Sequence, residues 1–252
     1  MIKLVDLTKV YRGFTAVDHI DLEVPSGRVF GFLGPNGAGK TTTIRMMAGV
    51  MKPTEGRIEL EGLDLRTHPS EAKGLVGFIP DRPFLYEKLT GMEFLLFMAG
   101  LYRLTHGAPS DDRALELLGL FELTDWGDEL IESYSHGMKQ RLVMCAALLH
   151  RPRILIVDEP MVGLDPKAAR LVKDIFRSQA AEGTTVFMST HSLEVAQEVC
   201  EEIAIIQSGR IIAKGTAEDL GKQAGLDGTL ESVFLKLTQE RMSTHERPRT
   251  PS

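Results

Sequence analysis

The sequence predicts an α/β fold: a mostly parallel sheet with flanking helices, an N-terminal antiparallel β subdomain and an inserted α-helical subdomain. Three features support this prediction. A short apolar run starting at Val29 leads into a glycine-rich loop and then into helix-forming residues. Residues 154–157, Ile-Leu-Ile-Val, are apolar throughout, as is typical of a parallel strand covered on both faces. Between these segments, residues 82–133 carry leucines at helical spacing.

The N-terminal segments have the pattern of half-buried strands. Residues 2–7, 20–24 and 57–61 alternate apolar and polar side chains, which predicts an antiparallel sheet beside the glycine-rich loop. Tyr11 is expected on a loop between the first two of these strands. Its ring could stack on an adenine base, although a lone tyrosine near a turn more often serves packing.

The glycine-rich loop is the strongest single signal. Gly34, four further residues, Gly39, Lys40 and Thr41 match the phosphate-binding pattern G-x-x-x-x-G-K-[ST]. Glycines allow a tight curl that directs successive amides inward, and the following helix adds its positive end. Lys40 is expected to reach the β- and γ-phosphates, and the Thr41 hydroxyl to ligate Mg²⁺. The nucleotide-contacting residues are expected to be Gly34, Pro35, Asn36, Gly37, Ala38, Gly39, Lys40, Thr41 and Thr42.

The inserted segment is predicted to be helical. A strand at 75–79 ends at Pro80-Asp81, and helix-like pieces follow at 92–101 and 110–118. The apolar residues Phe94, Leu95, Phe97 and Met98 are compatible both with a core face and with a partner-docking surface.

A further helix is expected over 139–150, opened by residues 134–138. Ser135 is a natural N-cap, and Gly137 allows close backbone approach. Two interpretations stay equally open from these residues: a capped helix, and a second anion site at the helix N-terminus.

Two carboxylates follow the apolar strand 154–157. Ligands of open α/β sheets bind beyond the carboxyl ends of the strands, which is where Asp158 and Glu159 are expected. Beside a phosphate loop, Asp158 would hold Mg²⁺, directly or through water. Glu159 would orient and deprotonate the attacking water.

The remaining segments continue the α/β pattern. Asp165 precedes a helix at 167–180 and is expected to be its cap. His191 follows a strand at 185–189; it could donate a hydrogen bond to a γ-phosphate, although an isolated histidine is more often a capping or surface group. The other expected elements are a helix at 193–201, a hairpin of 203–207 with 210–213, a helix at 229–237 and a disordered tail at 244–252.

These elements predict a domain organisation. The nucleotide-binding core with its antiparallel region comprises residues 1–81 and 150–215, and the helical subdomain comprises 82–149. A C-terminal helical extension covers 216–243, and the tail covers 244–252.

Composition limits the classes of function. The net charge is −6, so no global positive field favours nucleic acid, and none is expected as a partner. Cys145 and Cys200 lack metal-ligand spacing and are expected to be buried residues in a reducing cytosol. The longest apolar stretch, 94–102, is far shorter than a membrane span, and no secretory signal is visible after Met1, so a soluble protein is expected.

Taken in order, these motifs resemble the ATP-binding cassette (ABC) ATPases over residues 1 to about 215. Residues 229–237 also resemble the tail of single-cassette exporter ATPases. The resemblance implies a P-loop NTPase core that binds ATP and Mg²⁺, with Tyr11 stacking on adenine and His191 sensing the γ-phosphate. It implies that Ser135 and Gly137 form the signature motif, and that Asp165 lies in the loop that contacts an opposing subunit.

The resemblance also implies partners. Two cassettes, identical or paralogous, would pair head to tail and sandwich ATP, and a separate membrane-spanning permease would be driven in export. The chain would then lie peripherally on the cytoplasmic face of the cell membrane. Two alternatives are a soluble ABC-type ATPase that acts on ribosomes or nucleic acid, and a nucleotide-binding regulator without turnover.

Two residues depart from the family pattern. Asp81 stands where a glutamine usually links Mg²⁺, the attacking water and the transport partner. Its shorter, charged side chain could bind the metal more strongly or fail to reach the water. His136 stands where the signature motif usually has glycine. Because Ser135 and Gly137 remain, His136 is expected to be a tolerated variation.

Overall fold

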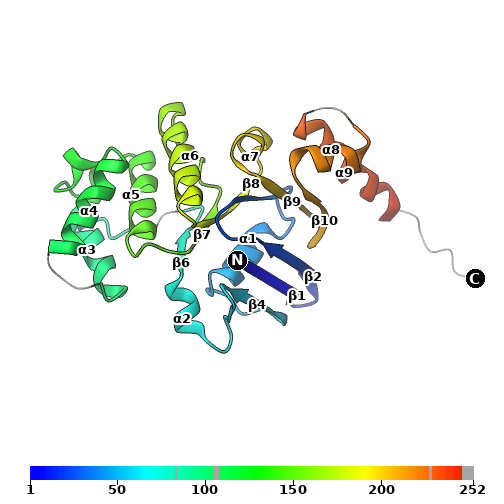
Figure 1. Cartoon of the computed structure of the whole chain (residues 1–252), viewed down its shortest axis with the longest axis horizontal. Coiled ribbons are helices and arrows are strands. Elements are labelled where there is room, and N and C mark those ends of the chain that lie inside the picture. Colours follow the sequence, from blue (N-terminus) through cyan, green and yellow to red (C-terminus); the bar gives the residue numbers. More distant parts are fainter. Residues whose placement is uncertain (83, 105–107, 227–228, 246–252) are drawn as a thin grey trace, which may run out of the picture.

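Two β-sheets lie at the centre of the computed structural model, which describes residues 1–82, 84–104, 108–226 and 229–245. A six-stranded sheet has the order β10-β9-β3-β8-β7-β6, and a four-stranded sheet has the order β2-β1-β4-β5. Helices α3, α4 and α5 form one end of the molecule, and α8 and α9 form the other (Figure 1). This architecture confirms the predicted fold class.

The larger sheet is parallel except at one edge. Its strands are β3 (Val29–Leu33), β6 (Val76–Ile79), β7 (Ile154–Asp158), β8 (Thr185–Thr190) and β9 (Glu202–Gln207), with β10 (Arg210–Gly215) antiparallel to β9. Every residue of β3, β7 and β8 is buried, as the apolar runs predicted. Leu33 pairs with Thr190, and Asp158 pairs with Ser189. The carboxyl ends of these three neighbouring strands therefore meet at one edge of the sheet.

The smaller sheet is antiparallel and comprises β1 (Ile2–Tyr11), β2 (Phe14–Val24), β4 (Glu55–Leu60) and β5 (Leu63–Asp64). The first two strands are longer than predicted. Tyr11 is the last residue of β1 and pairs with Phe14, so its expected place on a loop is wrong. Arg12 and Gly13 connect the strands with φ angles of 41° and 87°, the left-handed backbone of a tight hairpin turn.

Nine α-helices occur in the described part of the chain. They are α1 (Lys40–Met47), α2 (Pro69–Gly74), α3 (Gly91–Leu101), α4 (Ala108–Leu120), α5 (His136–Leu148), α6 (Pro166–Ala181), α7 (Leu193–Val199), α8 (Ala217–Ala224) and α9 (Leu230–His245). Two short 3₁₀ turns cover Thr124–Trp126 and Ile131–Ser133. Within these residues, no helix combines the length and the apolar character needed to cross a bilayer.

Some boundaries differ from those predicted. Helix α5 begins at His136 rather than at residue 139, because Ser135 caps it. Helix α9 extends to His245, so Thr244 and His245 are helical rather than part of the tail. The rest of the predicted tail, residues 246–252, lies outside the described residues.

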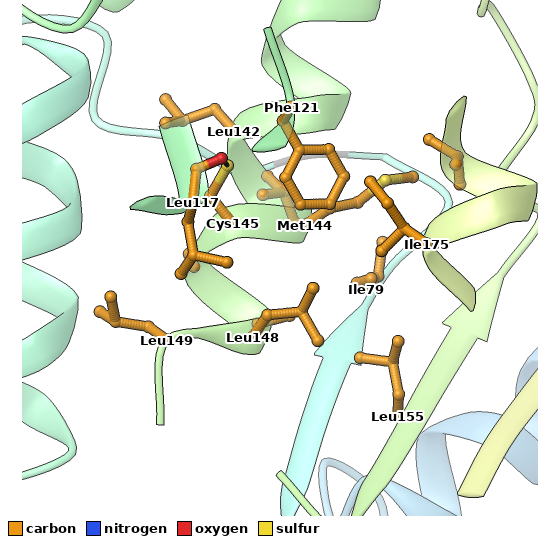
Figure 2. Packing of buried hydrophobic residues seen from close by; sticks show 14 of the residues in the cluster. Ile79, Leu117, Phe121, Leu142, Met144, Cys145, Leu148, Leu149, Leu155 and Ile175 are labelled. Carbon is orange, nitrogen blue, oxygen red and sulfur yellow. Dashed lines mark hydrogen bonds between the residues drawn. The ribbon is translucent and has the colours of Figure 1, made fainter. Parts of the chain in front are cut away.

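The helical end is fixed to the larger sheet by a continuous apolar core. Figure 2 shows Leu117 and Phe121 of the α4 region facing Leu142, Met144 and Cys145 of α5. Ile79 of β6, Leu155 of β7 and Ile175 of α6 complete the cluster. Both cysteines are free, as expected; Cys145 is fully buried, whereas Cys200 is only partly buried, which differs from the prediction. Burial raises the pKa of the Cys145 thiol.

From the sequence, the apolar residues of α3 were compatible with both a core face and a docking surface. In the structure, some of them are buried in the core and others are exposed. Phe94 and Leu95 are buried, whereas Phe97 is 42% exposed. Phe97 lies in a groove of about 270 Å³ with the exposed residues Phe84, Tyr86 and Leu101. The Tyr86 ring meets the Phe97 ring edge-on at 5.4 Å between centroids.

A second apolar core contains residues of β3 and α1, the two elements that flank the glycine-rich loop. Phe30 and Phe32 of β3 pack against Phe187 of β8, with ring centroids 5.6 and 5.4 Å apart. Ile44 and Met46 of α1 are buried in the same cluster. Both ends of the loop are therefore anchored in tightly packed elements, which holds its backbone in place.

Candidate nucleotide-binding site

The loop between β3 and α1 needs glycine for two physical reasons. Gly37 and Gly39 adopt φ angles of 78° and 109°, which favour glycine. A Cβ on Gly34 would lie 2.3 Å from the carbonyl oxygen of Ile206, and one on Gly39 would lie 2.5 Å from that of Ala16. Close packing against β9 and β2 therefore shapes the loop as much as the backbone angles do.

Lys40 is the first residue of α1 and is buried beneath the loop. Its Nζ donates hydrogen bonds to the carbonyl oxygens of Gly34 at 2.6 Å and Pro35 at 3.2 Å. Burial lowers the pKa of Lys40, and the negative charges of Glu159 and Asp158 oppose that shift. No side chain caps the start of α1. The first amides of this helix have no acceptors within the helix, so an anion can bind them.

Asp158 ends strand β7 and is almost fully buried. Its carboxylate accepts a hydrogen bond from the hydroxyl of Ser189, and the Thr41 side chain lies near it. Burial raises the pKa of Asp158, and the interactions with Ser189 and Thr41 partly counteract the increase. The carboxylate is thus held next to the hydroxyl that the sequence analysis assigned to the same metal ion.

Glu159 has a strained backbone that directs its side chain. Its φ angle is 51°, a left-handed conformation that residues other than glycine rarely adopt, and such strain concentrates at functional sites. The backbone amide donates to the carbonyl oxygen of Ser189 at 3.1 Å. The carboxylate Oε1 lies 2.9 Å from Nδ1 of His191, and Oε2 accepts from the His191 amide at 3.4 Å. Glu159 and His191 therefore form one hydrogen-bonded unit.

A cavity of about 460 Å³ brings most of the predicted site residues together. Its lining comprises Tyr11, Phe14, Ala16, Pro35, Asn36, Gly37, Gly39, Lys40, Thr41, Thr42, Asp81, Glu159 and His191. Gly34, Ala38 and Asp158 do not line the cavity; they support its wall from behind. The cavity combines the glycine-rich loop and Lys40 with the aromatic rings of Tyr11 and Phe14.

The aromatic part of the cavity contains the predicted Tyr11 and one aromatic residue that was not predicted, Phe14. Tyr11 is 40% exposed, and its hydroxyl contacts the Met51 sulfur at 2.7 Å. Phe14 is 64% exposed and lies opposite Tyr11 across the hairpin. The two-residue turn Arg12-Gly13 would have revealed this pairing. Ser189, which holds Asp158, gave no comparable signal.

Ser135, Gly137 and Asp165 are predicted site residues that lie outside this cavity. Ser135 Oγ accepts from the amide of Met138 at 3.3 Å and caps α5. Asp165 Oδ1 accepts from the amide of Ala168 at 2.9 Å and caps α6, and this hydrogen bond lowers the pKa of Asp165. These two hydrogen bonds confirm both capping predictions. Both residues are exposed, and their roles toward a nucleotide remain predictions.

Comparison with known proteins identifies the family. A family model described as ABC transporter matches residues 17–162. The chain belongs to the ABC transporter family. As the resemblance implied, it is an ATP-binding ATPase cassette.

Two relatives illustrate how similar this cassette is to curated members of its family. The daunorubicin/doxorubicin resistance ATP-binding protein DrrA of Streptomyces peucetius is 41% identical over 219 residues, which are 87% of this chain and 66% of that protein. The linearmycin resistance ATP-binding protein LnrL of Bacillus subtilis is 37% identical over 92% of this chain and 74% of its own length.

Solved structures agree with the fold of the cassette. An ATP-binding subunit of an ABC transporter superimposes with a TM-score of 0.89 at 34% identity, covering 94% of this chain and 99% of that chain. The dimeric cassette MJ0796, described in a post-hydrolysis state bound to ADP and Pi, gives a TM-score of 0.78 at 26% identity, covering 86% of this chain and 98% of that chain.

The oxygen atoms around Asp158 also suit a magnesium ion. Mg²⁺ prefers oxygen ligands and commonly binds one or two carboxylates together with substrate phosphates. The Asp158 carboxylate and the Thr41 hydroxyl are already adjacent, and Asp81 lines the same cavity. The donor set therefore fits Mg²⁺ in its chemistry.

Proposed function

We propose that this cassette hydrolyses Mg-ATP to power export through a separate membrane permease, from the cytoplasmic face of the membrane. The observation that carries the proposal is one cavity lined by both Lys40 and Glu159, at the carboxyl edge of the parallel sheet. The names of relatives support it: DrrA and LnrL are named for drug resistance, and BcrA of Bacillus licheniformis is named a bacitracin transport ATP-binding protein.

The chemistry follows from the positions of the groups. The loop amides and the Lys40 ammonium bind the β- and γ-phosphates, where charge accumulates during phosphoryl transfer. Thr41 and Asp158 would hold Mg²⁺, which would supply further neutralisation of phosphate charge. Glu159 accepts the proton of the attacking water, and its hydrogen bond with His191 at 2.9 Å fixes the carboxylate orientation. His191 is exposed on the cavity side and can also donate to a γ-phosphate.

Asp81 is the residue of the cavity that departs from the family pattern. It lines the cavity, and its charge contributes to the raised pKa of Asp158. We infer that Asp81 takes the place of the usual glutamine near the metal, with altered coupling to the permease and preserved hydrolysis.

A second cassette would complete the site. Ser135, Gly137 and Asp165 lie outside the cavity that contains Lys40, so they require another chain to reach a nucleotide. Head-to-tail pairing would place the α5 N-terminus of one chain on the ATP of the other. ATP would stabilise the closed pair through its higher affinity for that state, and loss of the γ-phosphate would reopen it.

The permease is proposed to dock in the aromatic groove beside α3. An exposed apolar patch of this kind is typical of a protein interaction site. Phe84, Tyr86, Phe97 and Leu101 are 81%, 49%, 42% and 62% exposed, respectively. The groove includes Pro80, next to Asp81, so a bound partner would contact the chain close to the nucleotide cavity.

Purification of the tagged protein from detergent-solubilised membranes tests this function. We expect a polytopic membrane protein to co-purify and to increase the rate of Mg-ATP turnover. Phe97→Asp should abolish co-purification, whereas Leu115→Asp, at an exposed apolar position of α4 outside the groove, should not. Salt-sensitive co-purification with RNA or DNA instead would favour the soluble alternative, and turnover at background would favour the regulator.

A further inference from the structure

The departure from the family pattern at His136 creates a contact between two segments of the cassette. His136 is the first residue of α5, directly after the cap Ser135. Its imidazole ring covers Gly163, the last residue of the turn that precedes Asp165 and helix α6. Residues of the signature segment and of the turn before α6 are therefore packed together within one chain.

The glycine geometry defines this contact. A Cβ added to Gly163 would lie only 2.3 Å from Cδ2 and 2.7 Å from Nε2 of His136, so the ring occupies that space. Gly163 also has a φ angle of 79°, which independently favours glycine. On the α5 side, a Cβ on Gly137 would lie 3.6 Å from the Gly163 carbonyl oxygen and 3.6 Å from Leu164 Cδ2, both ordinary contacts. His136 is thus the side chain that fills this interface most tightly.

Short hydrogen-bonded turns connect Gly163 back to Glu159. The amide of Val162 donates to the carbonyl oxygen of Glu159 at 3.3 Å, and that of Leu164 donates to the carbonyl oxygen of Met161 at 3.3 Å. The Asp165 cap on α6 fixes the far end of the segment. These two overlapping turns join the backbone of Glu159 to that of Gly163. Movement of Glu159 can therefore reach the ring of His136.

We propose that His136 is a positioning residue that couples the Glu159 segment of each chain to its own Ser135. This inference rests on the proposed head-to-tail pairing, in which Ser135 faces the ATP of the partner chain. Through the packing of its ring on Gly163, His136 then couples the two ATP sites, so that the occupancy of one site changes the ATP affinity of the other. ABC ATPases usually have glycine at this position, so the link belongs to chains that carry a bulky residue there.

Three variants separate this role from a merely structural one. His136→Gly removes the ring and restores the usual family residue, whereas His136→Phe keeps a flat ring without the nitrogens. His68→Gly is the matched control, because His68 is also exposed and directly precedes a helix far from this contact. Each protein is assayed for Mg-ADP affinity by calorimetry, and for the turnover rate and Hill coefficient by the ATP dependence of hydrolysis.

We expect His136→Gly to keep Mg-ADP affinity, because Lys40 and its loop are untouched. Its Hill coefficient should fall below that of the wild type, and the ATP concentration for half-maximal turnover should rise about fivefold, the lower end of typical coupling between sites. His136→Phe and His68→Gly should resemble the wild type. A wild type without cooperativity, a His136→Gly variant with wild-type cooperativity, or an equal defect in His136→Phe would each overturn the inference.

A second measurement distinguishes this inference from the pairing on which it rests. In the Glu159→Gln background, ATP should produce dimers, and adding His136→Gly should raise the ATP concentration needed for half-maximal dimer formation about fivefold. If Glu159→Gln alone stays monomeric with ATP, the proposed pairing fails. If it dimerises and His136→Gly has no effect on the ATP dependence, only the inference about His136 fails.

Discussion

The buried Lys40 provides the sharpest separation of nucleotide binding from folding. Replacing Lys40 with methionine keeps most of the side-chain volume and removes the ammonium. The two carbonyl oxygens of Gly34 and Pro35, at 2.6 and 3.2 Å, lose their donor. Pro35 lines the open cavity, so water can replace the lost donor at its carbonyl, whereas the Gly34 carbonyl is buried and stays without that donor.

The expected magnitudes differ for binding and for stability. A hydrogen bond to a charged group contributes about 1.5–3 kcal/mol, so losing the contact with phosphate should weaken Mg-ADP binding about 10- to 150-fold. Burial lowers the pKa of Lys40, which means that the folded protein disfavours its charged form. Removing that charge offsets the two lost hydrogen bonds, so the free energy of unfolding of the nucleotide-free protein should change by less than about 1 kcal/mol.

Calorimetric titration with Mg-ADP measures the binding, and urea unfolding without nucleotide measures the stability. Lys222→Met is the matched control, since Lys222 is an exposed lysine on α8, away from the cavity. An Mg-ADP affinity within twofold of wild type in Lys40→Met would refute the assignment of Lys40. A large loss of stability would instead refute the reasoning about its burial.

Three further predictions concern other described residues. Tyr11→Ala should weaken ATP binding about 5- to 150-fold, the loss expected for one base–aromatic stack, while tripolyphosphate binding and Tyr11→Phe stay near wild type; equal losses for both ligands would contradict stacking. The His150 ring stacks on the Tyr102 ring with 3.8 Å between centroids, and burial lowers the pKa of His150 to about 4. As the pH falls from about 7 toward 4, His150 of the unfolded chain is protonated before His150 of the folded protein, so the free energy of unfolding decreases in this window. His150→Phe should therefore reduce the stability loss between about pH 7 and 5 by about 1 kcal/mol in urea unfolding, after allowance for solvent screening. An identical pH dependence in both proteins would disprove this. Asp81→Gln should change the permease-stimulated ATPase rate while hydrolysis survives, and unchanged basal and stimulated rates would show that Asp81 has no role in coupling.

The sequence was most informative where local pattern and buried position coincide. The apolar runs of β3, β7 and β8 are buried at every residue, so composition alone located the centre of the parallel sheet. The glycine-rich loop was equally predictable, because its spacing reflects backbone angles at Gly37 and Gly39 that few other residues tolerate.

Short elements and long-range contacts were less predictable. Helices α2 and α8 span six and eight residues, too few for a clear apolar period, although the Thr216-Asp219 capping box at α8 was a readable signal. The strained φ of Glu159 and the contact between His136 and Gly163 depend on tertiary packing. No local pattern encodes them; His136 was expected to be a tolerated variation because Ser135 and Gly137 remain.

The most direct test of the central claim is the behaviour of Glu159→Gln with Mg-ATP, followed by light scattering and phosphate release. We expect turnover at background and a stable dimer that retains ATP, whereas Glu194→Gln, at an exposed position of α7, should hydrolyse ATP like the wild type. Wild-type turnover by Glu159→Gln, or a monomer at saturating ATP, would contradict the proposal that Glu159 activates water in a site shared by two chains.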